Sequence, residues 1–350
     1  MKNCFNLLVA IVGIAIAIVA CDKEDHEIVA GDGTLKILVS ATVDALNNEA
    51  ITRTTIGTFN ETENTILWGE NETLKIAVLG DGAVSKDTWA TKTTSEFNGL
   101  PTATFDFTVT PASNKTGTSY TYVGIYPASA SVDESSVTEH KVNLRTIQDA
   151  TADSYDPEAY ILVARPDEGH NASNANWNAY FRRATALNKI TLKNIPEPIE
   201  SVEFIATSGK NLTGSRYIDL STGNSGAIYD GSNTVTINYV TPNAGSIEEG
   251  VNCKTIWFTS WDVEIVAGET LTVIAKSATK YYKRIITARE EGILFKEGFL
   301  NTLGINMATA ELVYNNYSLT MQSQDVVYDN NDHAAFTSIY SWGGAPFDGL

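Results

Sequence analysis

Cysteine is scarce in this sequence, and its scarcity excludes a disulfide framework. Three cysteines are present. Cys4 and Cys21 lie within and at the end of the N-terminal apolar segment, so only Cys253 belongs to the body of the chain. One cysteine cannot form an intramolecular disulfide, and the stability of the body must therefore come from its core. Cys253 lies beside an apolar stretch and is expected to be a small buried hydrophobic residue.

Residues that carry catalysis or bind metals are also few. The four histidines are His26, His140, His170 and His333. None has a partner at metal-ligand spacing, so each is expected to be a surface or loop residue. Residues 223–227 approach the nucleophile elbow G-x-S-x-G but end in alanine, and Gly209-Lys210 lacks the rest of a phosphate-binding loop. The run Asp329-Asn330-Asn331-Asp332, with Asp325, indicates a solvated turn or a weak Ca²⁺ site. We expect no enzyme activity, no metal and no cofactor.

Basic side chains are fewer than acidic ones in this sequence. The chain has 24 lysines and arginines against 42 aspartates and glutamates, a net charge of −18. Acidic side chains repel phosphate backbones and anionic lipids, which argues against a nucleic-acid partner and excludes polybasic docking to a membrane. The length exceeds that of a usual single domain and predicts two domains.

One long and mostly apolar run occurs, from Phe5 to Ala20, after a short basic start. It suits a signal peptide and is short for a membrane span. Its end, Ile18-Val19-Ala20-Cys21, is typical of a lipobox, so we predict a signal peptide over 1–20 and lipid attachment at Cys21. The charged run 22–27 is either a plain tether or resembles the export signal of surface-exposed Bacteroidetes outer-membrane lipoproteins.

Beyond the charged run the apolar period is two. Leu35, Ile37, Val39, Ala41 and Val43 alternate with more polar residues, which predicts a strand with one apolar face. Similar patterns predict strands over 74–79, 103–109, 119–126 and 160–164. Turn residues close each run and long amphipathic helical patterns are absent, so the sequence predicts an all-β fold of the sandwich type.

A polar stretch of small residues at 169–176 predicts a linker. Strands are expected after it over 189–192, 201–206, 234–239, 255–259, 271–277, 281–287, 302–308 and 311–314. The predicted organisation is a tether with a removable first strand over 21–53, domains over 54–175 and 176–314, and an appendage over 315–350. Trp257 and Trp261, four apart in a β region, either pack in the core or stack on sugar rings.

Several segments, taken in their order along the chain, resemble a known family. They are ITRTT at 51–55, LWG at 67–69, LKIAV at 74–78, YVGIYP at 122–127, FRRATAL at 181–187, VAGE at 266–269 and FKEG at 295–298. With the lipobox, they resemble the fimbrillin family of Bacteroidales, which comprises type V pilins and related surface lipoproteins. The last ten residues match no element of that family.

The resemblance implies two tandem transthyretin-like Greek-key β-sandwich domains. In the family's stalk pilins an arginine-specific protease cuts near the first strand, and the freed groove accepts a strand of the next subunit. Arg53 is the matching position, with Thr54 as the new N-terminus; otherwise Arg53 is an exposed loop arginine. The alternating Tyr317, Leu319 and Met321 make the C-terminal segment of a neighbour the candidate donor strand.

The leading functional hypothesis is a structural or adhesive subunit of a cell-surface fimbria, exported as a lipoprotein. Its expected partners are other fimbrial subunits, the outer membrane through the lipid anchor, and a host protein or glycan. The alternative is a monomeric surface glycan-binding lipoprotein. A hydrolase ranks third, because no paired acids stand in a recognisable context.

Overall fold

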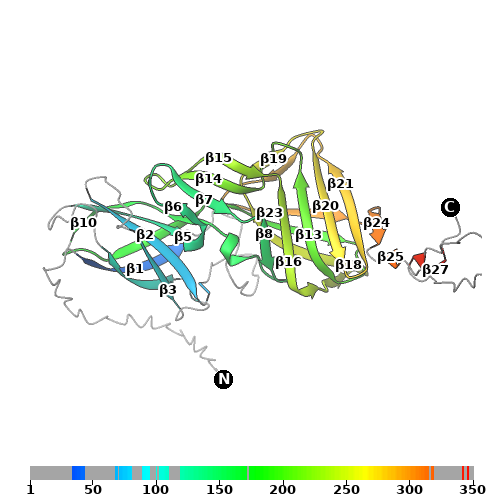
Figure 1. Ribbon diagram of the computed structural model, residues 1–350, viewed down its shortest axis with the longest axis horizontal. Coiled ribbons are helices and arrows are strands. Elements are labelled where there is room, and N and C mark those ends of the chain that lie inside the picture. Colours follow the sequence, from blue (N-terminus) through cyan, green and yellow to red (C-terminus); the bar gives the residue numbers. More distant parts are fainter. Residues whose placement is uncertain are drawn as a thin grey trace, which may run out of the picture.

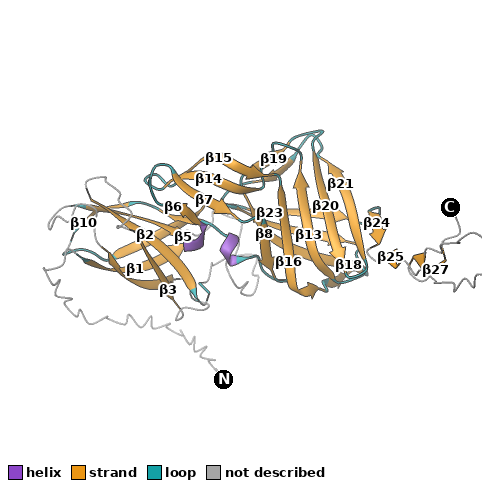
Figure 2. Cartoon of the chain, in the orientation of Figure 1, coloured by secondary structure: helices purple, strands orange, loops and turns teal. Residues whose placement is uncertain are grey.

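The computed structural model describes residues 34–43, 68–69, 71–80, 89–94, 100, 102–109, 119–171, 173–314, 317–318, 341–342 and 345–346. Within these residues the chain is almost entirely β-structure, which confirms the all-β prediction (Figure 2). The described part has no α-helix, only the short 3-10 helices η2 (Ala128–Ala130) and η3 (Pro157–Ala159). No helix in that part is long and apolar enough to cross a membrane.

The first sheet curls around its own core. Its strand order is β3 (Trp89–Thr94), β2 (Glu72–Gly80), β5 (Tyr120–Tyr126), β9 (Leu162–Ala164), β11 (Trp177–Arg183), β1 (Leu35–Val43) and β4 (Thr102–Val109), and β10 (Asp167–His170) also pairs with β5. All of these pairs are antiparallel except β1 with β11. The two edge strands β3 and β4 contact each other, so the inner faces of the sheet enclose one hydrophobic cluster.

A small second sheet covers part of the first. Its order is β15 (Asn224–Ser232), β14 (Thr213–Asp219), β7 (His140–Leu144) and β6 (Ser131–Asp133). Side chains of β7 and β14 form a second cluster with the outward-facing residues of β2, β5 and β9. These three strands are therefore buried on both faces, which explains their nearly continuous apolar sequences.

Two further sheets form a sandwich in the second half of the molecule (Figure 1). One contains β17 (Ser246–Glu248), β18 (Val251–Ser260), β12 (Ala186–Lys193) and β23 (Leu300–Asn306). The other contains β24 (Glu311–Tyr314), β21 (Lys280–Thr287), β20 (Thr270–Ser277), β13 (Ile199–Ala206), β16 (Thr234–Asn243) and β8 (Ile147–Ala150). The ribbon β19 (Val263–Ile265) with β22 (Ile293–Phe295) lies beside them. The backbones of β25 (Tyr317–Ser318), β26 (Ser341–Trp342) and β27 (Ala345–Pro346) pair in a separate small sheet.

Strand pairing crosses the expected domain boundary in both directions. β11 follows residue 175 but pairs with β1 and β9 of the first sheet. β7 and β8 precede it but pair with β14 and β16. The boundary at 175 stays a prediction, and the two halves of the chain contribute strands to each other.

Candidate functional site

β1 fills the space between β11 and β4 in the first sheet. Its sequence alternates because only one of its faces meets the core. Ile37, Val39 and Ala41 are at most 1 % exposed, and Leu35 and Val43 are also buried. Each large apolar side chain of β1 contributes roughly 1.5–3 kcal/mol when fully buried. Both edges of the strand are hydrogen-bonded, so β1 supplies backbone partners as well as core volume.

Three alanines meet at one level of this sheet. Ala41 of β1 faces Ala103 of β4 on one side and Ala179 of β11 on the other. All three are completely buried. On the neighbouring levels β1 faces large rings instead, because Val39 pairs with Phe105 and Val43 pairs with Phe181. We call the three alanines the alanine level.

The indole of Trp68 lies at the alanine level. Its Nε1 donates a hydrogen bond to the carbonyl oxygen of Ala41 at 3.0 Å. Its ring meets Phe105 and Phe181 edge-on, with centroids 5.6 and 6.3 Å away. The two phenylalanines stand on the levels to either side of the alanines, so the small side chains leave the room that the indole occupies. Trp68 is itself fully buried.

Contacts outside β1 hold Trp68 in place. Its backbone amide donates to the carbonyl of Leu100 at 2.7 Å. Tyr126 of β5 contacts the indole edge-on at 5.4 Å and also donates its hydroxyl to the buried carboxylate of Glu72. The same carboxylate accepts from the amide of Gly69 at 2.8 Å. Trp68 is thus positioned by β4, β5, β11 and the start of β2.

Most site residues expected from the sequence lie outside the described residues. This holds for Cys21, Arg53, Thr54, Leu319 and Met321. Tyr317 lies in β25, where its backbone pairs with Trp342. The lipid attachment, the cleavage and the donor strand therefore stay predictions. Asp325 and the run 329–332 also lie outside the described part.

Two histidines depart from the expectation of surface or loop positions, which is wrong for both. His140 begins β7 and is fully buried, with its ring 4.9 Å from that of Trp89 and Nε2 2.9 Å from Ser131 Oγ. Burial lowers the pKa of His140 to about 4. His170 stacks on Tyr122 at 4.2 Å and pairs with Asp167. Aromatic neighbours that are distant in sequence cover both rings, and a sequence pattern does not reveal such neighbours.

The remaining expected core residues are buried. Trp257 and Trp261 are at most 3 % exposed and belong to two different clusters, which excludes a sugar platform made by this pair. Cys253 is buried and free, and burial raises the pKa of its thiol. Within the described residues no group of three histidine, cysteine, aspartate or glutamate side chains is arranged to hold a metal ion.

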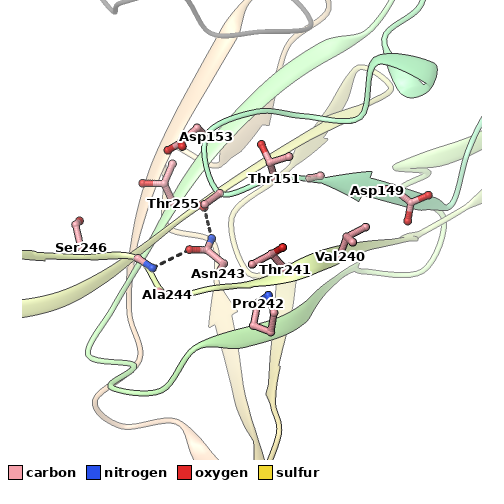
Figure 3. A pocket seen from close by; sticks show the side chains of 13 residues that line it. Asp149, Thr151, Asp153, Val240, Thr241, Pro242, Asn243, Ala244, Ser246 and Thr255 are labelled. Atoms are coloured by element: carbon pink, nitrogen blue, oxygen red, sulfur yellow. Dashed lines mark hydrogen bonds between the residues drawn. The ribbon is translucent and has the colours of Figure 1, made fainter.

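A hollow of about 530 Å³ lies at the edge of the second sandwich (Figure 3). Its walls come from 149–153, which include the end of β8, from 240–246, and from Thr255. The side chain of Asn243 already makes hydrogen bonds within the protein: it donates to the carbonyl of Thr255 and accepts from the amide of Gly245, both at 2.9 Å. No aromatic or basic side chain is among the described residues that line this hollow. It offers no ring for a sugar and no cation for an anionic ligand.

Partly buried ion pairs connect the two halves of the molecule. Arg182 of β11 donates to Glu297 at 2.8 Å, and Arg216 of β14 lies 3.5 Å from the other carboxylate oxygen. Ser225 of β15 also donates to Glu297, at 2.7 Å. Glu297 therefore joins the first sheet and the small sheet to the turn between β22 and β23.

Comparison with known proteins gave no match to a protein-family model and none to a curated protein. Among solved structures, a candidate cell adhesion protein of Bacteroides uniformis shows 13% identity and a TM-score of 0.43, covering 81% of this chain and 98% of that one. A fimbrial assembly protein of Parabacteroides distasonis shows 9% identity and a TM-score of 0.39, with 81% and 99% covered. Candidate polysaccharide-binding proteins of Bacteroides thetaiotaomicron show 9% identity and a TM-score of 0.38, with 80% and 96% covered. All three of these solved structures come from Bacteroides or Parabacteroides species.

Proposed function

We propose that this chain is a structural or adhesive subunit of a cell-surface fimbria that reaches the surface as a lipoprotein with its lipid on Cys21. In this proposal cleavage after Arg53 releases β1, and a strand of a neighbouring subunit takes its place. The supporting observation is the position of β1. It lines the core and is bonded on both edges.

The place of Arg53 in the sequence suits such an exchange. β1 ends at Val43, and the next described residue is Trp68. A cut after Arg53 therefore separates β1 from every other described strand while cutting none of them. The remaining chain keeps a groove with an apolar floor and two rows of unpaired backbone groups. Such a groove is a template for another strand.

The test compares Arg53→Ala with Arg53→Lys in cells that carry the chain. Both variants should leave the subunit intact, lipid-bound and absent from fibres, because an arginine-specific protease accepts neither side chain. N-terminal sequencing of native fimbriae should find Thr54. A first residue at Cys21 in native fimbriae, or fimbriae without this chain, contradicts the proposal.

Lipidation is tested separately. Cys21→Ala should release the precursor from the membrane fraction and abolish labelling by a clickable fatty acid, because acyl chains supply the anchoring. Cys253→Ala is the matched control, since that thiol is buried in the folded chain. Equal labelling of the Cys21→Ala variant contradicts lipid attachment at that residue.

One observation favours the alternative, a surface glycan-binding protein. Tyr217 of β14 and Tyr229 of β15 lie with their rings 4.6 Å apart, and Tyr229 is 43% exposed. Exposed aromatic rings stack on sugar faces. Retention of the purified chain on surface polysaccharides, lost in Tyr229→Ala and without fibre formation, would favour this function over the fimbrial one.

A further inference from the structure

We propose that Trp68 fixes the register of whichever strand occupies the β1 position. A strand from a second chain is accepted there only when a small side chain stands at the alanine level. The inference rests on the proposed function for the origin of that strand. The occupant we assign is the segment that begins at Tyr317 in a second copy of this chain.

Trp68 keeps its place when β1 leaves, because its contacts are mostly with other strands. Its amide is bonded to Leu100, and its ring is enclosed by Phe105, Tyr126 and Phe181. Its Nε1 is bonded to β1, through the carbonyl of Ala41. The empty groove would therefore present a fixed indole N–H at one level.

An incoming strand meets two demands at that level. It must offer a backbone carbonyl to the indole, because a buried N–H without an acceptor is costly. It must also carry a side chain no larger than alanine or serine, since Ala103 and Ala179 complete a level already filled by the ring. A slip by two residues puts Val39 or Val43 beneath the indole, and a slip by one turns the apolar face outward.

The C-terminal segment satisfies this rule in sequence. The inward residues of β1 run Leu35, Ile37, Val39 and then Ala41. From Tyr317 the alternate residues are Tyr317, Leu319, Met321 and then Ser323. Three apolar side chains are followed by a small one in both, in the same chain direction. In this register Ser323 takes the place of Ala41, and the match ends there, because the next alternate residue, Asp325, falls at the position of Val43 at the end of β1.

The test uses the full mature chain with a site-specific protease sequence at residue 53, cut while β1 stays bound. Labelled peptides then compete with β1. The peptides are residues 34–44, the same with Ala41→Ser, with Ala41→Leu or with Ile37→Leu, and residues 316–326. The Ala41→Leu peptide should bind ~10–100-fold more weakly than the unchanged one, because overpacking at a filled level is destabilising. The Ile37→Leu peptide is the matched control and should bind within about threefold of it.

Variants of the acceptor separate the two demands. In Trp68→Ala the penalty of the Ala41→Leu peptide should disappear, because the indole no longer fills the level. In Trp68→Phe the penalty of the Ala41→Leu peptide should persist, because a ring still fills the level. The variant has no indole N–H, so it requires no carbonyl at that level. Equal binding of the unchanged and Ala41→Leu peptides to the wild-type acceptor overturns the register rule. Absence of uptake for every peptide overturns the acceptor role, and uptake of 34–44 without 316–326 overturns the assigned occupant.

The uncut chain provides an independent measurement. Ala41→Leu should lower the denaturant midpoint, and adding Trp68→Ala should recover part of that loss if the two side chains share one space. Purely additive effects contradict the rule. If the peptides discriminate as expected but native fimbriae lack the chain, the fimbrial function fails and the register rule stands.

Discussion

The first sheet and the second sandwich enclose hydrophobic cores of similar size, but their cores are assembled from the chain in different ways. In the second sandwich every residue of the buried cluster except Ala150 lies within 186–307. In the first sheet the cluster begins with β1 and extends to Trp257. One core is thus nearly continuous in sequence, and the other includes a strand that the proposed cut after Arg53 would detach. The proposed strand exchange would therefore act on the first sheet and leave every strand of the second sandwich in place.

The largest expected effect comes from placing a charge in β1. Val39→Asp puts a carboxylate at a fully buried position between Phe105 and Trp177. Burying an unpaired charge belongs to the class of substitutions that cost more than about 4 kcal/mol. Hydrogen exchange should show loss of protection in β1, β4 and β11 while β13 and β20 stay protected. Uniform loss over both regions would show that they unfold together.

A substitution in the second sandwich tests the other core. Phe204 is fully buried and stacks on Phe258 with centroids 4.7 Å apart. Phe204→Ala should lower the free energy of unfolding by about 3–5 kcal/mol, because it leaves a cavity. The loss of protection should be confined to β13, β16, β18 and β20. Exposure of β1 by this variant would contradict the independence of the first sheet.

Acid should weaken the small sheet that lies on the first one. The folded pKa of His140, about 4, is below its unfolded value of ~6.5, so the unfolded chain takes up the proton first. The contribution of neutral His140 to the free energy of unfolding is fully present above pH ~6.5. It is lost as the pH falls toward 4, by roughly 3 kcal/mol in total. Chemical denaturation at pH 7.5, 5.5 and 4.5 measures it. In His140→Gln this part of the pH dependence should vanish, and an unchanged slope would exclude His140 as its source.

The smallest effect should come from the ions that join the two halves. Glu297→Gln keeps a hydrogen-bond acceptor but removes the charge that faces Arg182 and Arg216. It should lower the free energy of unfolding by about 2 kcal/mol and separate the transitions of the two regions in differential scanning calorimetry. Glu311→Gln is the matched control, because its pair with Lys283 is exposed and 3.9 Å long. Equal behaviour of the two variants would show that Glu297 does not connect the halves.

Sequence patterns predicted the strands that have one buried face or two. β1, β2, β13 and β20 were expected at nearly their observed bounds, because alternation or an apolar run follows directly from burial. β14 and β15 were not expected, since their exposed faces carry many small and polar residues. The pairing of β7 with β14 could not be predicted from sequence patterns either, because the paired residues lie about 70 positions apart in the chain.

The candidate site was only half predictable. The apolar face of β1 follows from Leu35, Ile37 and Val39, and it was predicted. The role of Trp68 was not, because its contacts with Ala41, Phe105 and Phe181 join three separate segments. The one sequence signal was the alanine at position 41 among larger alternating residues. A single small residue does not reveal which side chain fills the space above it.

Some strands before residue 175 pair with strands after it. In a chain that is synthesised from its N-terminus, these pairs can form only after the second strand has been made. β8 pairs with β16, in the register Thr236 to Ile147. The edge of β8 therefore stays without its partner while the intervening residues are made. At roughly 5–20 residues per second this interval lasts about 4–18 seconds. During that time the edge of β8 is open, and its sheet is complete only after β16 has been made.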